Sequence, residues 1–276
     1  MTAPVLLVDE RDGVLTLTLN RPRRKNAIDR ELWMALRDEL TAVRAESGVR
    51  VVVLTGAGGA FCSGADLTAA ATDIHPLERL RLLGDVALLL HELPVPTIAK
   101  VTGVAVGAGW NLALGCDFVV ATPESRFSQI FARRGLSPDC GGSWLLPKLV
   151  GLQQAKRLAL LGDLIDAEEA RFMNLVTWVV PDAEIDAFVE RLGRRLVAGP
   201  PVALAQTKAL LNEGVDRTLR DALASEGRAQ AVNLATADAP EAFAAFIEKR
   251  EPRFTGRWTL SGDKNPVESP MEVPDA

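Results

Sequence analysis

The chain of 276 residues contains no tyrosine, only two histidines and only three cysteines. The absence of tyrosine excludes tyrosine catalysis. Cys62, Cys116 and Cys140 are too few and too scattered for a disulfide framework, and no Cys-x-x-Cys or Cys/His cluster indicates a metal site. We therefore expect no metal, and a reduced protein in the cytoplasm.

Long apolar runs are also missing. Stretches such as Val86–Leu90 fall far short of a membrane span, and the first residues carry acids where a signal peptide needs an apolar run. The net charge of −5 gives no reason to expect nucleic acid as a partner. With 48% hydrophobic and 24% charged residues, the composition is that of a globular protein with a sizeable core.

Hydrophobic patterning predicts an α/β fold. Strands are expected at 5–9, 14–19, 51–54, 97–101, 118–121 and 176–180, and helices at 29–46, 77–92, 112–114, within 141–172 and throughout 183–249. Strands and helices alternate early, and helices take over late. We place a core at 1–195, a C-terminal helical region at 196–258 and a poorly ordered tail at 259–276.

Two glycine-rich loops follow apolar strands. Residues 56–67 read GAGGAFCSGADL, and residues 102–117 read TGVAVGAGWNLALGCD. Backbone N–H groups exposed at such loops stabilise an anion. One such loop alone would favour a phosphate loop or a simple tight turn, and no nucleotide-binding signature is matched. Together they suggest two N–H groups aimed at one point.

These loops, with LTLNRPRRKNAID, FARRGLSPDCGGSWLLPKLVG and EAFAAFIEKREPRFTGR in order, resemble the crotonase, or enoyl-CoA hydratase/isomerase, superfamily over residues 1 to about 257. The resemblance implies a spiral of ββα units followed by a helical trimerisation region, and hence a homotrimer or hexamer. It also implies an acyl-CoA thioester as substrate, with no permanently bound cofactor. The N–H groups of Ala65 and Ala108 would stabilise the thioester enolate.

The acids of the family's hydratases are not present. The resemblance aligns their two glutamates with Asn111 and Phe131, which can neither act as a base nor hold a water. Asp139 matches the acid/base position of several isomerases, although by itself it could equally cap a helix starting near Gly141. Its apolar neighbours would raise its pKa if they line the pocket.

Further contacts follow from the resemblance. The basic loop 21–25 would lie beside the CoA phosphates and pantetheine, and the last helix would reach CoA from a neighbouring subunit. The implied substrate and CoA contacts are Arg24, Lys25, Ala27, Ala65, Asp66, Leu67, Ala108, Trp110, Phe131, Trp144, Phe246 and Lys249. From the residues alone, Trp110 and Trp144 could equally be core, whereas His75, His91 and Cys62 are interpreted as structural.

A single carboxylate favours one reaction. It can take a proton from one carbon of an acyl chain and return it to another, which shifts a double bond. The segments GLSPDCGGSWLLP and LALLGDLIDAEEA most resemble the ring-opening isomerases of phenylacetate degradation, which act on a ring epoxide of phenylacetyl-CoA. The alternatives are hydration, thioester hydrolysis, dehalogenation with Asp139 as nucleophile, and acyl-CoA binding without catalysis.

Overall fold

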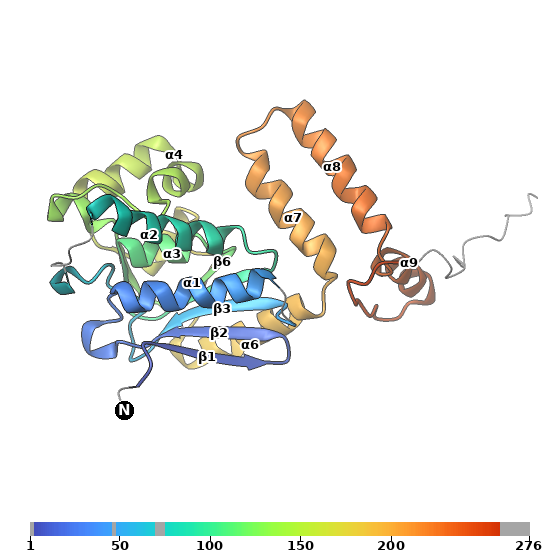
Figure 1. Ribbon diagram of the computed structural model, residues 1–276, viewed down its shortest axis with the longest axis horizontal. Helices are drawn as coiled ribbons and strands as arrows, with labels where there is room; N and C mark the ends of the chain where they lie inside the picture. Colours follow the sequence, from blue (N-terminus) through green and yellow to red (C-terminus); the bar gives the residue numbers. More distant parts are fainter. Residues whose placement is uncertain (1–2, 46–47, 70–74, 260–276) are drawn as a thin grey trace, which may run out of the picture. The chain divides into compact units, whose positions relative to one another are not determined.

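The computed structural model describes residues 3–45, 48–69 and 75–259 (Figure 1). The chain divides into two compact units, Met1–Gly199 and a second that begins at Pro200. This division falls four residues after the boundary expected after residue 195, and helix α6 (Asp182–Val197) spans the expected position. The break comes at Gly199-Pro200, where proline ends the helical hydrogen bonding. Of the tail expected at 259–276, residues 260–276 lie outside the described residues.

The first unit is built on a six-stranded sheet in order β1-β2-β3-β4-β6-β9. Its strands are β1 (Leu6–Arg11), β2 (Val14–Leu19), β3 (Val51–Gly56), β4 (Thr97–Val101), β6 (Phe118–Ala121) and β9 (Trp178–Val179). Strands β1 and β2 form an antiparallel hairpin whose turn, Asp12-Gly13, has positive φ at both residues. This conformation favours glycine and aspartate. All other neighbours in the sheet pair in parallel.

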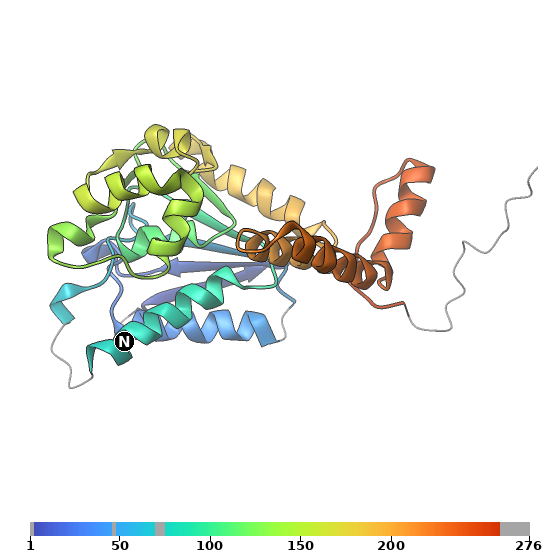
Figure 2. The ribbon, with the colours of Figure 1, turned by 90° about the horizontal axis from the view of Figure 1, so that it is seen from above.

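The continuous apolar run of β3 is buried on both faces. Val52 and Leu54 belong to the main core cluster with the apolar faces of α1 (Arg30–Ala45) and α2 (Pro76–His91). Val51 and Val53 point to the opposite face and pack with Ile185 of α6. Figure 2 shows the sheet between these helical layers.

The sequence analysis missed a second sheet of three short strands. It pairs β5 (Val104–Val106) with β7 (Arg126–Ser128) and β7 with β8 (Ile165–Asp166). Strands of two or three residues are too short to show a periodic pattern. Strand β5 lies inside the second glycine-rich loop, so it fixes the path of that loop.

The first unit contains three further α-helices among the described residues. They are α3 (Ala108–Leu114), α4 (Gly142–Leu161) and α5 (Ala167–Phe172). Every residue of α3 is buried. Helix α4 bends at Gly151, where φ is 73°.

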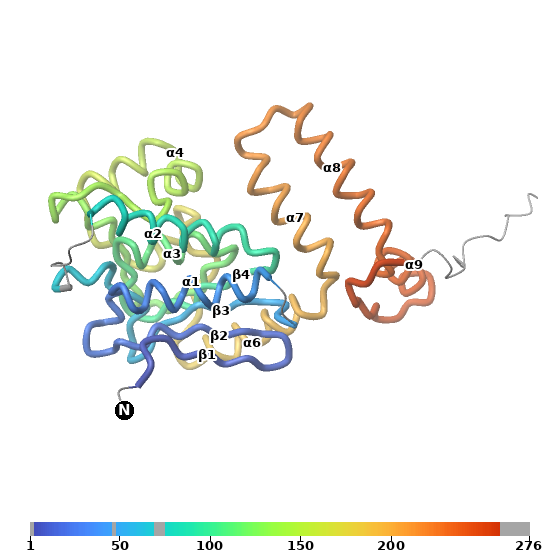
Figure 3. Tube along the Cα trace, viewed as in Figure 1, coloured from blue at the N-terminus to red at the C-terminus, as the bar shows by residue number. Residues whose placement is uncertain are grey.

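The second unit is helical, as predicted. It consists of α7 (Pro201–Gly214), α8 (Leu219–Leu234) and α9 (Asp238–Glu248) (Figure 3). Asp238 accepts hydrogen bonds from the N–H groups of Thr255 and Gly256, which ties the following segment back to α9. Among the described residues, no helix combines the length and apolarity needed to cross a membrane.

Candidate active site

The two glycine-rich loops run side by side in parallel. The N–H of Cys62 donates to the carbonyl of Val104, and the N–H of Val106 donates to the carbonyl of Cys62, each at 2.9 Å. This pairs Cys62 with Ala105. Ala65 and Ala108 each lie three residues further along, so the same register brings their backbones toward one another.

Glycine allows these backbones to touch. A Cβ on Gly64, whose φ is +96°, would lie 3.0 Å from the carbonyl oxygen of Val106 and 3.9 Å from the nitrogen of Ala108. A Cβ on Gly109 would lie 2.6 Å from the Cβ and Sγ of Cys62. Larger residues at these two positions would separate the loops.

The two N–H groups expected to stabilise an anion belong to Ala65, which is exposed, and to Ala108, which is buried. Neither donates to an acceptor within the part of the chain that the structure describes. Ala108 is the first residue of α3, where backbone N–H groups have no partner inside the helix. The pair therefore has the chemistry of an oxyanion site.

The basic loop is joined to the first glycine-rich loop. The N–H of Ser63 donates to the carbonyl of Lys25 at 2.9 Å, and its hydroxyl donates to the carbonyl of Arg24 at 3.1 Å. The guanidinium of Arg21 donates to the carbonyl of Ala27. Arg24 and Lys25 are exposed and make no ion pair with another described residue.

Asp66 holds its own loop. Its carboxylate accepts from the N–H and hydroxyl of Thr68 and pairs with Arg21 at 2.9 Å. The Thr68 hydroxyl, followed by the other hydrogen bonds and the charge of Arg21, lowers the pKa of Asp66. A carboxylate held ionised in this way fixes structure and does not carry protons.

Asp139 is not a helix cap. Helix α4 begins at Gly142, its cap is Gly141, and no side chain caps it. One carboxylate oxygen of Asp139, Oδ1, is buried and has no hydrogen-bond partner among the described residues. Burial raises the pKa of Asp139, and the hydrogen bond from the Cys140 thiol partly opposes that rise. Such a carboxyl suits general acid–base chemistry.

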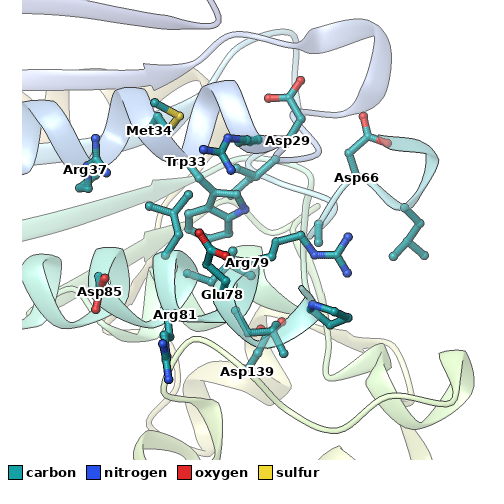
Figure 4. Close-up of a pocket in the computed structure, with 18 of the residues that line it drawn as sticks. Asp29, Trp33, Met34, Arg37, Asp66, Glu78, Arg79, Arg81, Asp85 and Asp139 are labelled. Atoms are coloured by element: carbon teal, nitrogen blue, oxygen red, sulfur yellow. The ribbon is translucent and has the colours of Figure 1, made fainter. Parts of the chain in front are cut away.

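A pocket joins Asp139 to Ala65. It has a volume of about 620 Å³ and is lined by the start of α1, the first half of α2, Ala65–Leu67 and 136–139. Trp33, Met34, Leu82, Leu83 and Leu136 supply apolar wall, and Figure 4 shows Asp139 across the pocket from Trp33. An apolar pocket with a few convergent polar groups is typical of a small-molecule site.

The two tryptophans that the resemblance places at the substrate lie outside this pocket. Trp110 is fully buried, stacks on Phe127 with ring centroids 5.4 Å apart, and its indole N–H has no partner among the described residues. Trp144 is 39% exposed on α4 and contacts His91 edge-on. Neither lines the pocket. Trp110 thus packs in the core with the rest of α3, all of which is buried.

Phe131 lies beside the second glycine-rich loop. It is buried, and its ring is 3.6 Å from where a Cβ on Gly107 would stand, directly before Ala108. Asn111 is also buried, and both polar atoms of its amide are used. It donates to the backbone carbonyl of Asp139 and accepts from Gln129, a residue that the sequence analysis did not single out. The only sequence signal for Gln129 is its position directly after the short strand β7 and before a short helical turn at Ile130–Arg134.

The remaining candidates have structural roles. His75 caps α2 by accepting from the N–H of Leu77 at 3.2 Å. Cys62 is buried, and burial raises its pKa to about 12, so it is no nucleophile at neutral pH. No group of three or more His, Cys, Asp or Glu side chains in the described segments could hold a metal ion.

Phe246 and Lys249 belong to the second unit. Phe246 is 85% exposed on α9, and Lys249 ends that helix with φ of +53°. Both are accessible, which their proposed role in CoA binding requires.

Comparison with known proteins identifies the class that this fold and site define. Residues 9–257 match the enoyl-CoA hydratase/isomerase family, and the chain belongs to that family. Its fold is therefore the crotonase-like α/β fold, with a helical C-terminal region.

Individual relatives carry both hydratase and isomerase names. The chain is 41% identical over 250 residues to a Rhodobacter capsulatus protein named "Probable enoyl-CoA hydratase", covering 89% of this chain and 96% of that one. It is 39% identical over 252 residues to the 1,2-epoxyphenylacetyl-CoA isomerase of Escherichia coli K12, with the same coverage. The crystal structure of an enoyl-CoA hydratase from Bacillus anthracis superposes with a TM-score of 0.88 at 32% identity, covering 92% of this chain and all of that one.

Proposed function

We propose that this chain is an acyl-CoA isomerase that shifts a double bond, or opens a ring epoxide, in a CoA thioester. The observation that carries the proposal is the carboxyl of Asp139, which lies in the same pocket as Ala65 and whose Oδ1 is buried with no partner among the described residues. Hydration is better served by two such groups, and Asn111 and Phe131 occupy the two positions expected for them.

The backbone N–H groups of Ala65 and Ala108 bind the thioester oxygen. As Asp139 removes a proton from the α-carbon of a 3-enoyl thioester, negative charge moves onto that oxygen. The N–H groups stabilise the resulting enolate, and loss of one such donor typically costs about 10²–10³ in rate. Asp139 then returns the proton to the γ-carbon, so the double bond moves to the α,β position and the carboxylate is regenerated.

The substrate carries CoA. Arg24 and Lys25 supply free cationic side chains near Ala65, suited to phosphate oxygens. Ala27, Asp66 and Leu67 line the path between this loop and the thioester. Phe131 shields the oxyanion site from water. The similarity to the 1,2-epoxyphenylacetyl-CoA isomerase supports an aromatic acyl group and a role in phenylacetate catabolism, with fatty acid metabolism as the alternative.

The working protein is a homotrimer or hexamer in the cytoplasm, in which α9 brings Phe246 and Lys249 to the CoA of a neighbouring subunit. The exposed apolar side chains of α9 support this assembly. Replacing Lys249 by glutamate then weakens CoA binding, because it places a negative charge near phosphate.

Two rates measured on the same preparation test the proposal. We expect 3-enoyl-CoA to be isomerised at an enzymatic rate, roughly 1–10³ per second, and crotonyl-CoA to be hydrated far more slowly. Fast hydration would show that the acids are misassigned. Release of free CoA would favour hydrolysis, release of halide from a halobenzoyl-CoA would favour dehalogenation, and binding without turnover would favour a passive carrier.

A further inference from the structure

The side-chain amides of two buried residues, Asn111 and Gln129, form a chain of hydrogen bonds that ends at the backbone of Asp139. Asn111 and Gln129 are each 1% exposed. The Nε2 of Gln129 donates to the Oδ1 of Asn111 at 2.7 Å, and the Nδ2 of Asn111 donates to the carbonyl oxygen of Asp139 at 2.9 Å.

The direction of these hydrogen bonds is fixed by chemistry. A backbone carbonyl can only accept, so the Asn111 atom facing Asp139 is its amide nitrogen. The Asn111 oxygen then faces Gln129, which must present its own nitrogen. This arrangement leaves the Oε1 of Gln129 buried without a partner among the described residues. Such a group costs free energy and, in a native protein, calls for an explanation.

The turn that follows Asp139 is built against this amide. A Cβ on Gly142 would lie 2.3 Å from the Nδ2 of Asn111. The Asp139 carbonyl also accepts from the N–H of Gly142 at 2.9 Å, and Cys140 and Gly141 both have positive φ. Asp139 therefore begins a tight turn, and its carbonyl accepts hydrogen bonds from both Asn111 and Gly142.

We propose that Asn111 and Gln129 are positioning residues that hold the backbone of Asp139 so that its carboxyl faces the thioester bound at Ala65 and Ala108. The inference rests on the proposed function, because it assigns Asp139 the proton transfer. Position 111, which carries an acid in the hydratase mechanism, here needs an amide. An ionised carboxylate at that position cannot donate to the Asp139 carbonyl.

The variant Asn111→Ala tests the inference. A displacement of about 1 Å can cost about 10² in rate, so we expect kcat for 3-enoyl-CoA isomerisation to fall by about that factor while KM changes little. The matched control is Thr55→Val, which removes another buried side-chain hydrogen bond of 2.9 Å, from Thr55 to the carbonyl of Lys100. Its kcat should stay close to that of the unchanged protein.

A double-mutant cycle separates positioning from a general loss of structure. In an Asp139→Asn background, Asn111→Ala should cause no further loss of kcat, because the group that it positions no longer works. An unchanged kcat in Asn111→Ala alone, or losses that multiply in the double variant, would overturn the inference. If Asn111→Ala does not fold, Gln129→Met, which also removes the unpaired Oε1, is judged by the same two criteria.

The two hypotheses fail in different ways. Full turnover in Asp139→Asn would overturn the proposed function itself. A severe loss in Asp139→Asn, with no loss in Asn111→Ala, would overturn only the positioning role.

Discussion

At the scale of single residues, the account depends on Asp139. Its environment differs from that of Asp66, a carboxylate in the same pocket. Asp66 is held ionised by Thr68 and Arg21, whereas the Oδ1 of Asp139 is buried without a partner among the described residues. Only the environment of Asp139 brings the pKa of a carboxyl closer to the working pH, where the group can both take up and release a proton.

The first prediction concerns this carboxyl. Asp139→Asn should lower kcat by at least about 10², since positioned acid–base groups contribute roughly 10²–10⁴. Calorimetric titration with a non-reacting acyl-CoA should give a Kd close to that of the unchanged protein, because the amide keeps the shape of the pocket. Near-normal turnover would remove Asp139 from the mechanism.

The second prediction concerns pH. The carboxyl must be ionised to remove a proton, and burial raises its pKa above the ordinary value of 3.8. The acid limb of kcat/KM should therefore lie above that value. An acid limb at or below the ordinary aspartate value would contradict the burial that the structure shows.

The same shift affects stability in a defined direction. Between the unfolded pKa and the raised folded pKa, the folded protein binds more protons, so its stability falls as pH rises. Asp139→Asn, which cannot ionise, should therefore have a higher Tm than the unchanged protein at neutral pH. Differential scanning calorimetry measures this difference, and a lower Tm in the variant would contradict it.

At the scale of elements, the site is produced by two loops in register. The pairing of Cys62 with Ala105 determines that Ala65 meets Ala108, and Gly64 and Gly109 allow the backbones to approach. The geometry of the proposed oxyanion site therefore depends on the residues that set this register and allow this approach.

The third prediction tests this close approach. Gly109→Ala forces the loops apart and should destabilise the protein by about 1–3 kcal/mol, typical of overpacking, and also lower kcat. Gly84→Ala is the control, because a Cβ there meets no atom within 4 Å on helix α2. It should raise stability by roughly 0.5–1 kcal/mol. Urea denaturation of both variants checks this, and equal stabilities would contradict it.

The elements with a clear pattern of apolar residues could be predicted from the sequence. The strands expected at 14–19 and 51–54 and the helix expected at 29–46 are confirmed as β2, β3 and α1. Strand β5 could not be predicted, because three residues carry no periodic signal. Asp139 was recognised from its motif, but Gln129 was not, since its role arises only when distant segments meet around Asn111.

At the scale of the whole molecule, the second unit raises the question of assembly. Its helices expose Leu211, Leu219, Phe243, Phe246 and Ile247, each more than 60% accessible. Soluble monomers rarely expose large contiguous apolar patches. The exposed side chains favour contact with further copies of the chain.

The fourth prediction is that the protein in solution has a mass equal to three or six chains. Light scattering on a size-exclusion column measures this mass directly. A monodisperse monomer with full activity would rule out both the assembly and the role of Phe246 and Lys249 in a neighbouring site.

The central claim is that Asp139 moves a proton between two carbons of an acyl-CoA and adds no water. The most direct measurement is mass spectrometry of the product formed from a 3-enoyl-CoA in D₂O. We expect a 2-enoyl-CoA that has gained no water, with product formation strongly reduced in Asp139→Asn. Because Asp139 carries the proton from the α-carbon to the γ-carbon, deuterium enters the γ-carbon only where that proton exchanges with solvent before it is transferred. A hydrated product, or product formation at the same rate in Asp139→Asn, would contradict the account.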